Sequence, residues 1–297
     1  MKRALLFPGQ GSQAIGMGKE LCGAFQAAKD VFQEVDDALS QKLSLLMFDG
    51  SDADLKLTEN TQPALMAVSM AVIRVLEKQA GKKVSDLAGY VAGHSLGEYA
   101  ALCAAGTFSL SDTARLLRRR GSAMQAAVPV GVGSMAALLG VDMQQAAEVA
   151  KEAAQGQVCA TANDNSVGQV VISGHKEAIE RAVAIAATKG FKRSVILPVS
   201  APFHCSLMQP AADVMQDALS NVKMNPPVVP VIANVTATEQ TDVNEIRKLL
   251  VAQVTGAVRW RESMLYLKEK SVEGAIEAGS GTVLAGLMKR IDKDIQV

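Results

Sequence analysis

A serine stands between two glycines where an apolar run ends and a helical pattern begins. The stretch Gly93-His94-Ser95-Leu96-Gly97 fits the G-x-S-x-G pattern of a nucleophile elbow, which needs a strand, a tight turn and then a helix. Small neighbours suit such a turn because its two chain directions nearly touch. The start of the helix would also direct backbone N–H groups and a positive dipole toward a developing oxyanion. This setting favours a catalytic serine over an incidental serine in a strand–helix turn.

A serine nucleophile needs a base near neutral pH, and the sequence offers three histidines. His94 adjoins Ser95, so its side chain is expected to point elsewhere, as a structural group or a pocket wall. His175 follows Ser173-Gly174 and is expected to open a helix. His204 follows a predicted strand where the chain leaves a small unit, and a loop at such a junction can reach a cleft. His204 is therefore the predicted base, with a packed loop histidine as the other interpretation.

No acidic residue beside the His204 segment is obviously placed to orient its imidazole ring. Glu98 is close to Ser95 in sequence, but it belongs to the predicted helix that follows the turn. A backbone carbonyl or an amide could hold the ring instead, and both possibilities stay open at this point.

Hydrophobic periodicity predicts alternating strands and helices along most of the chain. The predicted strands cover residues 4–7, 88–92, 134–139, 158–162, 170–173, 194–199, 228–233 and 272–277. The predicted helices cover residues 17–39, 61–79, 96–105, 109–127, 143–154, 177–187, 243–254, 263–270 and 282–290. The turn-rich residues 163–168 are expected to join two of the strands. The fold class is therefore α/β.

Residues 131–199 have an element order of their own, βαββαβ, which is that of a ferredoxin-like unit. We expect this stretch to be a small domain inserted into a larger α/β domain, which is made from residues 1–130 and 200–297.

The composition argues against several classes of protein. Lys plus Arg and Asp plus Glu both number 30, and a zero net charge favours neither nucleic acid nor an anionic membrane as a partner. No apolar run approaches the ~20 residues of a membrane span, and the apolar N-terminal segment is too short for a signal peptide. The four cysteines have no C-x-x-C spacing and predict neither a metal site nor a disulfide framework. We expect a cytoplasmic protein without metal or cofactor.

A dinucleotide-binding loop is a competing interpretation of the N-terminal glycines. Gly9-x-Gly11-x-x-Ala14 follows a predicted strand, as such a loop requires. That motif also needs an acidic residue at the end of a second strand ~20 residues further on. Glu34 lies in a helical pattern instead, which argues against this interpretation.

Six segments in a fixed order bring a known family into view. The chain resembles malonyl-CoA:acyl carrier protein transacylases over nearly its whole length. The segments that carry the resemblance are Phe7-Pro8-Gly9-Gln10-Gly11-Ser12-Gln13, Gly93-His94-Ser95-Leu96-Gly97-Glu98, Arg118-Arg119-Arg120-Gly121, Ala201-Pro202-Phe203-His204, Leu250-Val251-Ala252-Gln253 and Glu277-Ala278-Gly279-Ser280-Gly281. The resemblance implies a hydrolase-like parallel-sheet core with an inserted ferredoxin-like domain.

The resemblance also implies how the reaction is catalysed. Ser95 would be the acylated nucleophile, and His204 would activate it and later the acceptor thiol. The main-chain carbonyl of Gln253 would orient His204, which accounts for the missing acid. Gln10 and the backbone N–H of Leu96 would form the oxyanion hole.

The remaining implied residues concern the substrates, malonyl-CoA and a phosphopantetheinylated acyl carrier protein of fatty-acid or polyketide synthesis. Arg120 would bind the malonyl carboxylate, since an arginine fork grips a carboxylate and stays charged. Phe203 would crowd branched acyl groups, while Gln62 and Asn165 match family positions near the site. Arg118 and Arg119 are expected on a solvated helix face or as docking groups for an acidic carrier.

Two other activities use the same residues. A serine hydrolase or thioesterase could employ Ser95 and His204, but it would have no need for Arg120. A non-enzymatic subunit that docks a carrier protein would have no need for the intact nucleophile and base.

Overall fold

A five-stranded sheet lies at the centre of the computed structural model, which describes residues 2–191 and 193–297. Its strand order is β8-β7-β2-β1-β9. The strands are β1 (Arg3–Phe7), β2 (Tyr90–Gly93), β7 (Val231–Ile232), β8 (Glu239–Gln240) and β9 (Gly274–Glu277). β1 runs parallel to β2 and β9, and β2 runs parallel to β7, while β8 is antiparallel. The carboxyl ends of the parallel strands therefore meet at one edge.

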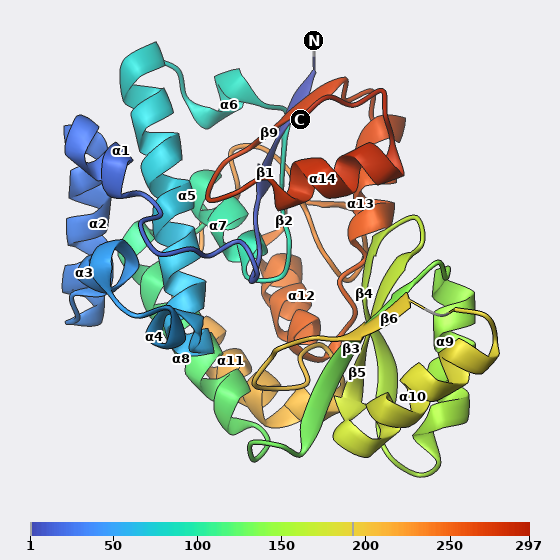
Figure 1. Cartoon of the computed structure of the whole chain (residues 1–297). Coiled ribbons are helices and arrows are strands. Elements are labelled where there is room, and N and C mark those ends of the chain that lie inside the picture. The colour runs from blue at the N-terminus through green and yellow to red at the C-terminus, as the bar shows by residue number, and fades with distance from the viewer. Residues whose placement is uncertain (1, 192) are drawn as a thin grey trace.

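Both faces of this sheet are covered, as expected for parallel strands that read as unbroken apolar runs. Leu5 and Phe7 of β1 point into one core, and Ala4 and Leu6 point into another. The alternation follows from the two-residue period of a strand. Figure 1 shows the first face covered by the blue-to-green helices and the second by the red ones.

The helices of the first face come mainly from the first half of the chain. They are α1 (Lys19–Ala24), α2 (Gln26–Leu39), α3 (Leu43–Asp49), α4 (Asp52–Lys56), α5 (Thr58–Ala80), α6 (Val84–Leu87), α7 (Gly97–Ala104) and α8 (Leu110–Ala126). The later elements are η1 (Ser206–Met208), α11 (Gln209–Ser220), α12 (Val243–Thr255), α13 (Trp260–Glu269) and α14 (Val283–Ile291). α5 is buried over most of its length, which its mostly apolar and small residues allow, while its C-terminal end is exposed.

A second, antiparallel sheet has the strand order β4-β5-β3-β6. Its elements follow one another as β3 (Gly133–Leu139), α9 (Met143–Ala154), β4 (Cys159–Ser166), β5 (Gln169–His175), α10 (Lys176–Thr188) and β6 (Arg193–Ile196). α9 and α10 pack on it around a separate apolar core, at the lower right of Figure 1. The observed order of elements is the predicted βαββαβ.

Strand β4 attaches the second sheet to the rest of the molecule. Asn163 forms an isolated parallel bridge with Val258. The backbone N–H of Asp164 donates to the Val258 carbonyl at 2.9 Å. The Asp164 carboxylate also accepts hydrogen bonds from Arg261 at 3.0–3.1 Å.

Several predicted elements differ from those observed. The predicted helix over residues 17–39 is two helices, because Phe25 is extended with φ −132° and caps the second one. Residues 163–166 belong to strand β4 rather than to a turn, and the side chains of Asp164 and Asn165 have hydrogen-bond partners outside their own sheet. Of the predicted strand over 228–233, only Val231–Ile232 is a strand in the structure. Periodicity missed α11, whose apolar face is spaced as a helix requires.

The predicted α/β class, with a parallel sheet and helices, is confirmed. Across residues 2–191 and 193–297, none of the helices combines the length and the apolarity that crossing a bilayer requires.

Candidate active site

Ser95 sits in a sharp turn between β2 and α7. Its backbone φ is 53°, in the left-handed region that residues with a Cβ seldom adopt. A Cβ on Gly93 would lie 1.9 Å from the carbonyl of Gly97, and a Cβ on Gly97 would lie 2.3 Å from the Phe7 carbonyl oxygen. Only glycine fits at either position, so both glycines of the motif are required by close backbone approach.

His204 reaches the nucleophile from a loop 109 residues further along the chain. Its Nε2 lies 2.8 Å from Ser95 Oγ, and its Nδ1 lies 2.9 Å from the Gln253 carbonyl and 3.1 Å from the Gly256 carbonyl. Because Nδ1 can only donate to carbonyls, Nε2 carries the lone pair that can accept the serine proton. Burial, together with the charge of Arg120, lowers the pKa of His204 to about 3, so the ring is neutral at pH 7.

Arg120 extends from α8 to the same serine oxygen. Its Nη2 donates to Ser95 Oγ at 3.2 Å and to Gln253 Oε1 at 2.8 Å, and its Nη1 donates to Gln62 Oε1 at 2.8 Å. The side chain is 1% exposed, and within the described residues its Nε has no hydrogen-bond partner. Burial lowers the pKa of Arg120, but a guanidinium stays charged near neutrality. The site therefore holds a buried cation whose partners are neutral amides and a hydroxyl.

Asn234 holds the turn from the adjacent strand and was missed in the sequence. It follows β7, and its Oδ1 accepts the Ser95 N–H at 2.8 Å while its Nδ2 donates to the Gly93 carbonyl at 2.7 Å. Its position in the sequence could have revealed it. Asn234 directly follows the predicted strand 228–233, and the carboxyl ends of parallel strands lie at the same edge of a sheet, where Ser95 also lies.

Glu98 is the second residue whose contacts were not foreseen. Its carboxylate is 1% exposed and accepts hydrogen bonds from Gln253 Nε2 at 2.8 Å and from the Asn234 N–H at 3.1 Å. Burial is the largest influence on it and raises its pKa to about 7. Glu98 has no contact with His204, whose Nδ1 is held by main-chain carbonyls.

A candidate oxyanion pocket lies beside the nucleophile. The Ser95 N–H is occupied by Asn234, whereas the Leu96 N–H donates to no acceptor in the part of the chain that the structure describes. Leu96 stands at the N-terminus of α7, where unpaired N–H groups and the helix dipole favour a negative charge. The exposed Gln10, which follows β1, lines the same cavity.

The cavity at Ser95 has a volume of about 160 Å³ and is shared by both sheets. The predicted site residues that line it are Gln10, Gln62, Ser95, Leu96, Arg120, Asn165, Phe203 and His204. Gln253 is fully buried and reaches the site through its hydrogen bonds. His94 lines the cavity, as expected from the sequence, and its Nε2 lies 2.8 Å from Asn165 Oδ1. Phe203 is 8% exposed and adds an apolar wall.

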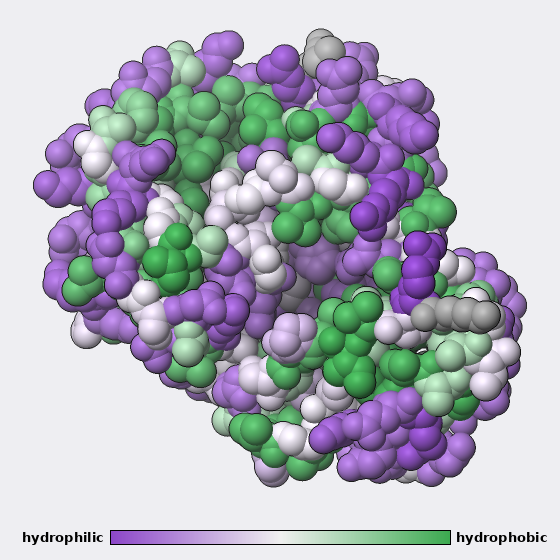
Figure 2. Space-filling view, viewed as in Figure 1, coloured by the Kyte–Doolittle hydropathy of each residue, from purple (hydrophilic) through white to green (hydrophobic). Residues whose placement is uncertain are grey.

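A groove of about 700 Å³ adjoins this cavity, since Gln10, Leu197 and Val199 line both. Figure 2 shows the molecule hollowed between its two parts, with hydrophobic residues on the rim formed by the second sheet. A long substrate arm could reach Ser95 along such a groove.

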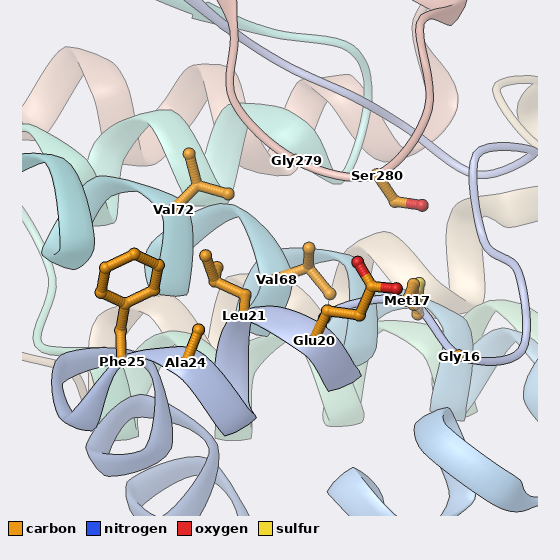
Figure 3. Close-up of a pocket in the computed structure, with 11 residues that line it drawn as sticks. Gly16, Met17, Glu20, Leu21, Ala24, Phe25, Val68, Val72, Gly279 and Ser280 are labelled. Carbon is orange, nitrogen blue, oxygen red and sulfur yellow. The ribbon is translucent and has the colours of Figure 1, made fainter.

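Another cavity, of about 520 Å³, lies between α1, α5 and the loop after β9. Figure 3 shows apolar side chains such as Leu21, Phe25 and Val72 on its walls, with Glu20 and Ser280 at one end. It shares no lining residue with the Ser95 cavity. Among the described residues, no group of three or more His, Cys, Asp or Glu side chains could hold a metal ion.

Comparison with known proteins shows what the chain resembles. The sequence model of the acyl transferase domain matches residues 4–293. Malonyl CoA-acyl carrier protein transacylase of Escherichia coli K12 is 45% identical over 97% of this chain and 92% of its own length. The protein of that name from Bacillus subtilis 168 is 44% identical over 99% and 92%.

Solved structures agree with these sequence matches. Acyl-carrier-protein-S-malonyltransferase from Bartonella henselae is 58% identical, with a TM-score of 0.97 over 100% of this chain and 94% of that one. A malonyl-transacylase solved in complex with its type II PKS acyl-carrier protein is 42% identical, with a TM-score of 0.96 over 100% and 94%.

Proposed function

The chain belongs to the acyl transferase family of malonyl CoA-acyl carrier protein transacylases, and from this premise we propose that it transfers malonyl groups from malonyl-CoA to the phosphopantetheine thiol of an acyl carrier protein. One observation supports this most strongly. A nucleophile, a neutral base and a buried guanidinium converge on one oxygen, Ser95 Oγ, with His204 Nε2 at 2.8 Å and Arg120 Nη2 at 3.2 Å.

The first half-reaction loads the enzyme. His204 Nε2 takes the hydroxyl proton of Ser95 as Oγ attacks the thioester carbonyl, and the same proton then goes to the departing thiolate of coenzyme A. The carbonyl oxygen becomes an oxyanion in the tetrahedral intermediate. In our proposal the Leu96 N–H and the side chain of Gln10 stabilise it, and losing one such donor typically costs on the order of 100-fold.

The second half-reaction transfers the acyl group from Ser95 to the acceptor thiol. The acceptor thiol loses its proton to His204 Nε2, its sulfur attacks the acyl ester, and the proton returns to Ser95 Oγ. The two steps are chemically alike because a thioester is exchanged for a thioester through one ester. The Gln253 carbonyl keeps the ring in the tautomer that both steps need.

Acyl-group choice is assigned to the residues around Arg120. A malonyl group carries a carboxylate that the guanidinium can bind with two parallel hydrogen bonds, and an acetyl group does not. Gln62 accepts a hydrogen bond from Nη1 of the guanidinium, whereas Gln253 accepts one from Nη2. Phe203 lines the cavity, where its ring would crowd a branch on the acyl chain. Asn165 acts in this proposal through His94, to which it is bonded.

We also propose the finer description of the fold and location. Residues 1–130 and 200–297 would form a hydrolase-like catalytic domain, and residues 131–199 a ferredoxin-like insertion, on the strength of the two sheets and their strand orders. A cytoplasmic location remains part of the proposal.

Intact-mass measurement tests the function directly. Malonyl-CoA alone should add one malonyl mass, which Ser95→Ala abolishes, and added holo-acyl carrier protein should remove it as malonyl carrier. Release of free malonate without a carrier product would instead identify a hydrolase.

Replacing Arg120 tests the carboxylate contact. Arg120→Ala should lower malonyl loading by roughly 100-fold or more and acetyl loading much less, because a charge-assisted bidentate contact is lost. Arg119→Ala, whose side chain is half-exposed and paired with Asp217, is the matched control and should change neither rate appreciably. Equal losses for both acyl groups in Arg120→Ala would refute this role.

A further inference from the structure

Gln253 contacts the catalytic base with its main chain and the buried arginine with its side chain. Its main-chain carbonyl accepts from His204, while its side-chain amide lies between Arg120 and Glu98. The amide oxygen accepts from Arg120 Nη2 at 2.8 Å, and the amide nitrogen donates to Glu98 Oε2 at 2.8 Å and to the Ser95 carbonyl at 3.0 Å. If the amide were reversed, its N–H groups would face those of Arg120, donor against donor.

Glu98 and the Ser95 carbonyl set this orientation together, because an ionised carboxylate and a carbonyl only accept hydrogen bonds. It lies one amide away from Arg120 and has no direct contact with it. The ionisable groups that face Glu98 are Arg120 of α8 and Tyr99 of its own helix. From α12 and from the segment after β7 it receives the amide N–H groups of Gln253 and Asn234.

This separation also leaves the cation available. A buried guanidinium needs a nearby negative charge, because an unpaired buried charge is costly. A carboxylate in direct contact would supply it but would occupy the bidentate edge that a substrate carboxylate needs. Placing the carboxylate behind an amide supplies the compensating charge, while Nη2 still reaches Ser95 Oγ and Nε keeps no hydrogen-bond partner among the described residues.

We propose that Glu98 is a positioning residue for acyl-group selection: through the amide of Gln253 it holds Arg120 in place beside Ser95 to receive the carboxylate of the acyl group. The inference rests on the proposed function, since it presumes malonyl loading on Ser95.

The first test replaces the charge without changing the shape. Glu98→Gln should lower kcat/KM for malonyl-CoA by roughly tenfold or more, because the Gln253 amide then bonds a neutral acceptor and Arg120 loses the carboxylate charge that faces it. It should lower acetyl-CoA loading by less than about threefold, since an acetyl group has no carboxylate for Arg120 to bind. Glu98→Asp, which keeps the charge but withdraws it by one methylene, should fall between wild type and Glu98→Gln. Equal losses for both acyl groups in Glu98→Gln, with an unchanged malonyl-to-acetyl ratio, would overturn the proposal.

The second test exchanges the two side chains. In Glu98→Gln/Gln253→Glu the net charge is conserved, but the carboxylate now faces Arg120 directly and competes with the substrate. The malonyl-to-acetyl ratio should fall below that of Glu98→Gln alone. Recovery of the wild-type ratio would show that only the charge count matters, and would contradict the positioning role.

The third test measures how the malonyl-to-acetyl ratio of the wild-type enzyme depends on pH. It uses no substituted protein, so its result cannot be lost through misfolding of a variant. Burial raises the pKa of Glu98 to about 7, so the carboxylate becomes protonated as the pH falls through neutrality. The wild-type malonyl-to-acetyl ratio should decline between pH 8 and pH 6, and a ratio constant over that range would overturn the inference. Failure of the wild-type enzyme to load malonyl at all would instead refute the proposed function.

Discussion

Ser95 and His204 both have backbone φ angles in the left-handed region, at 53° and 59°. For residues with a Cβ this conformation costs about 1–2 kcal/mol each. Hydrogen bonds hold both residues there: Asn234 and Gln253 bind the backbone of Ser95, and main-chain carbonyls bind the His204 ring. The strain is concentrated on the two groups that must exchange a proton, which is where proteins tend to store it.

The burial of His204 should appear in the pH dependence of stability. Its pKa is about 3 when folded, against 6.5 for an ordinary histidine, so between these values the unfolded chain binds the extra proton. The free energy of unfolding should therefore fall as the pH drops from 6.5 toward 3, by up to about 1.4 kcal/mol per pH unit. Urea unfolding of wild type and His204→Gln at several pH values measures this.

The variant isolates the histidine because His94 and Glu98 titrate in both proteins. Wild type should lose roughly 2–3 kcal/mol relative to His204→Gln between pH 6.5 and 4.5. Parallel curves for the two proteins over that range would show that folding leaves the pKa of His204 unchanged.

At the scale of elements, the site is assembled at one edge of the parallel sheet. Gln10 follows β1, Ser95 follows β2 and Asn234 follows β7, three strands that lie side by side. Helices α8 and α12 then bring Arg120 and Gln253 to this edge from outside the sheet. Open α/β sheets generally bind their ligands there, because the strands all release their loops on one side.

The crossing of β2 and α7 should not tolerate a single added methyl group. Gly93→Ala would force a Cβ to within 1.9 Å of the Gly97 backbone, and we expect a loss of more than about 3 kcal/mol of stability together with the loading activity. Gly23→Ala is the matched control: Gly23 is in helix α1 and a Cβ there would meet nothing within 4 Å.

The control should raise stability by up to about 1 kcal/mol, since alanine favours a helix over glycine by that amount. Differential scanning calorimetry of both variants gives the comparison. A Gly93→Ala protein that melts and loads like wild type would mean that the turn can widen.

The sequence predicted those parts of the site whose residues are neighbours along the chain, and missed contacts between residues far apart in sequence. The serine turn was readable because strand, glycines and helix are adjacent in sequence. The amide of Gln253 meets Glu98 across 155 residues, and Asn234 meets Ser95 across 139, so neither contact follows from periodicity. Strand β4 was predicted too short because its polar residues 163–166 resemble a turn, whereas Asn163 and Asp164 pair with Val258 and Arg261, outside the second sheet.

At the scale of the whole molecule, the Ser95 cavity exists only where the two sheets meet. Met135 and Val171 of the second sheet belong to its lining, together with Ser95 of the parallel-sheet core. The attachment through β4 therefore positions one side of the cavity, and the Asp164–Arg261 ion pair is part of it. The carboxylate of that pair is 1% exposed and the guanidinium 30%.

Removing the arginine should loosen this attachment. Arg261→Met leaves Asp164 buried without its cation, and we expect a loss of about 1–3 kcal/mol, less than for a fully buried pair because Arg261 is partly solvated. Hydrogen exchange should accelerate in β4 and around Val258. Arg119→Met removes the exposed pair with Asp217 and should cost less than about 1 kcal/mol. An equal effect of the two substitutions in chemical denaturation would argue against a special role for β4.

The long chain separation between Ser95 and His204 also has a consequence for biosynthesis. A ribosome adding 5–20 residues per second makes the nucleophile roughly 5–20 s before the base, which is 109 residues later. The Gln253 carbonyl that orients the base follows after 49 more residues, and β9, a neighbour of the first strand, comes later still. The nascent polypeptide thus carries its serine without base or orienting carbonyl for part of its synthesis, and the capacity to be acylated marks a chain that has been translated beyond Gln253.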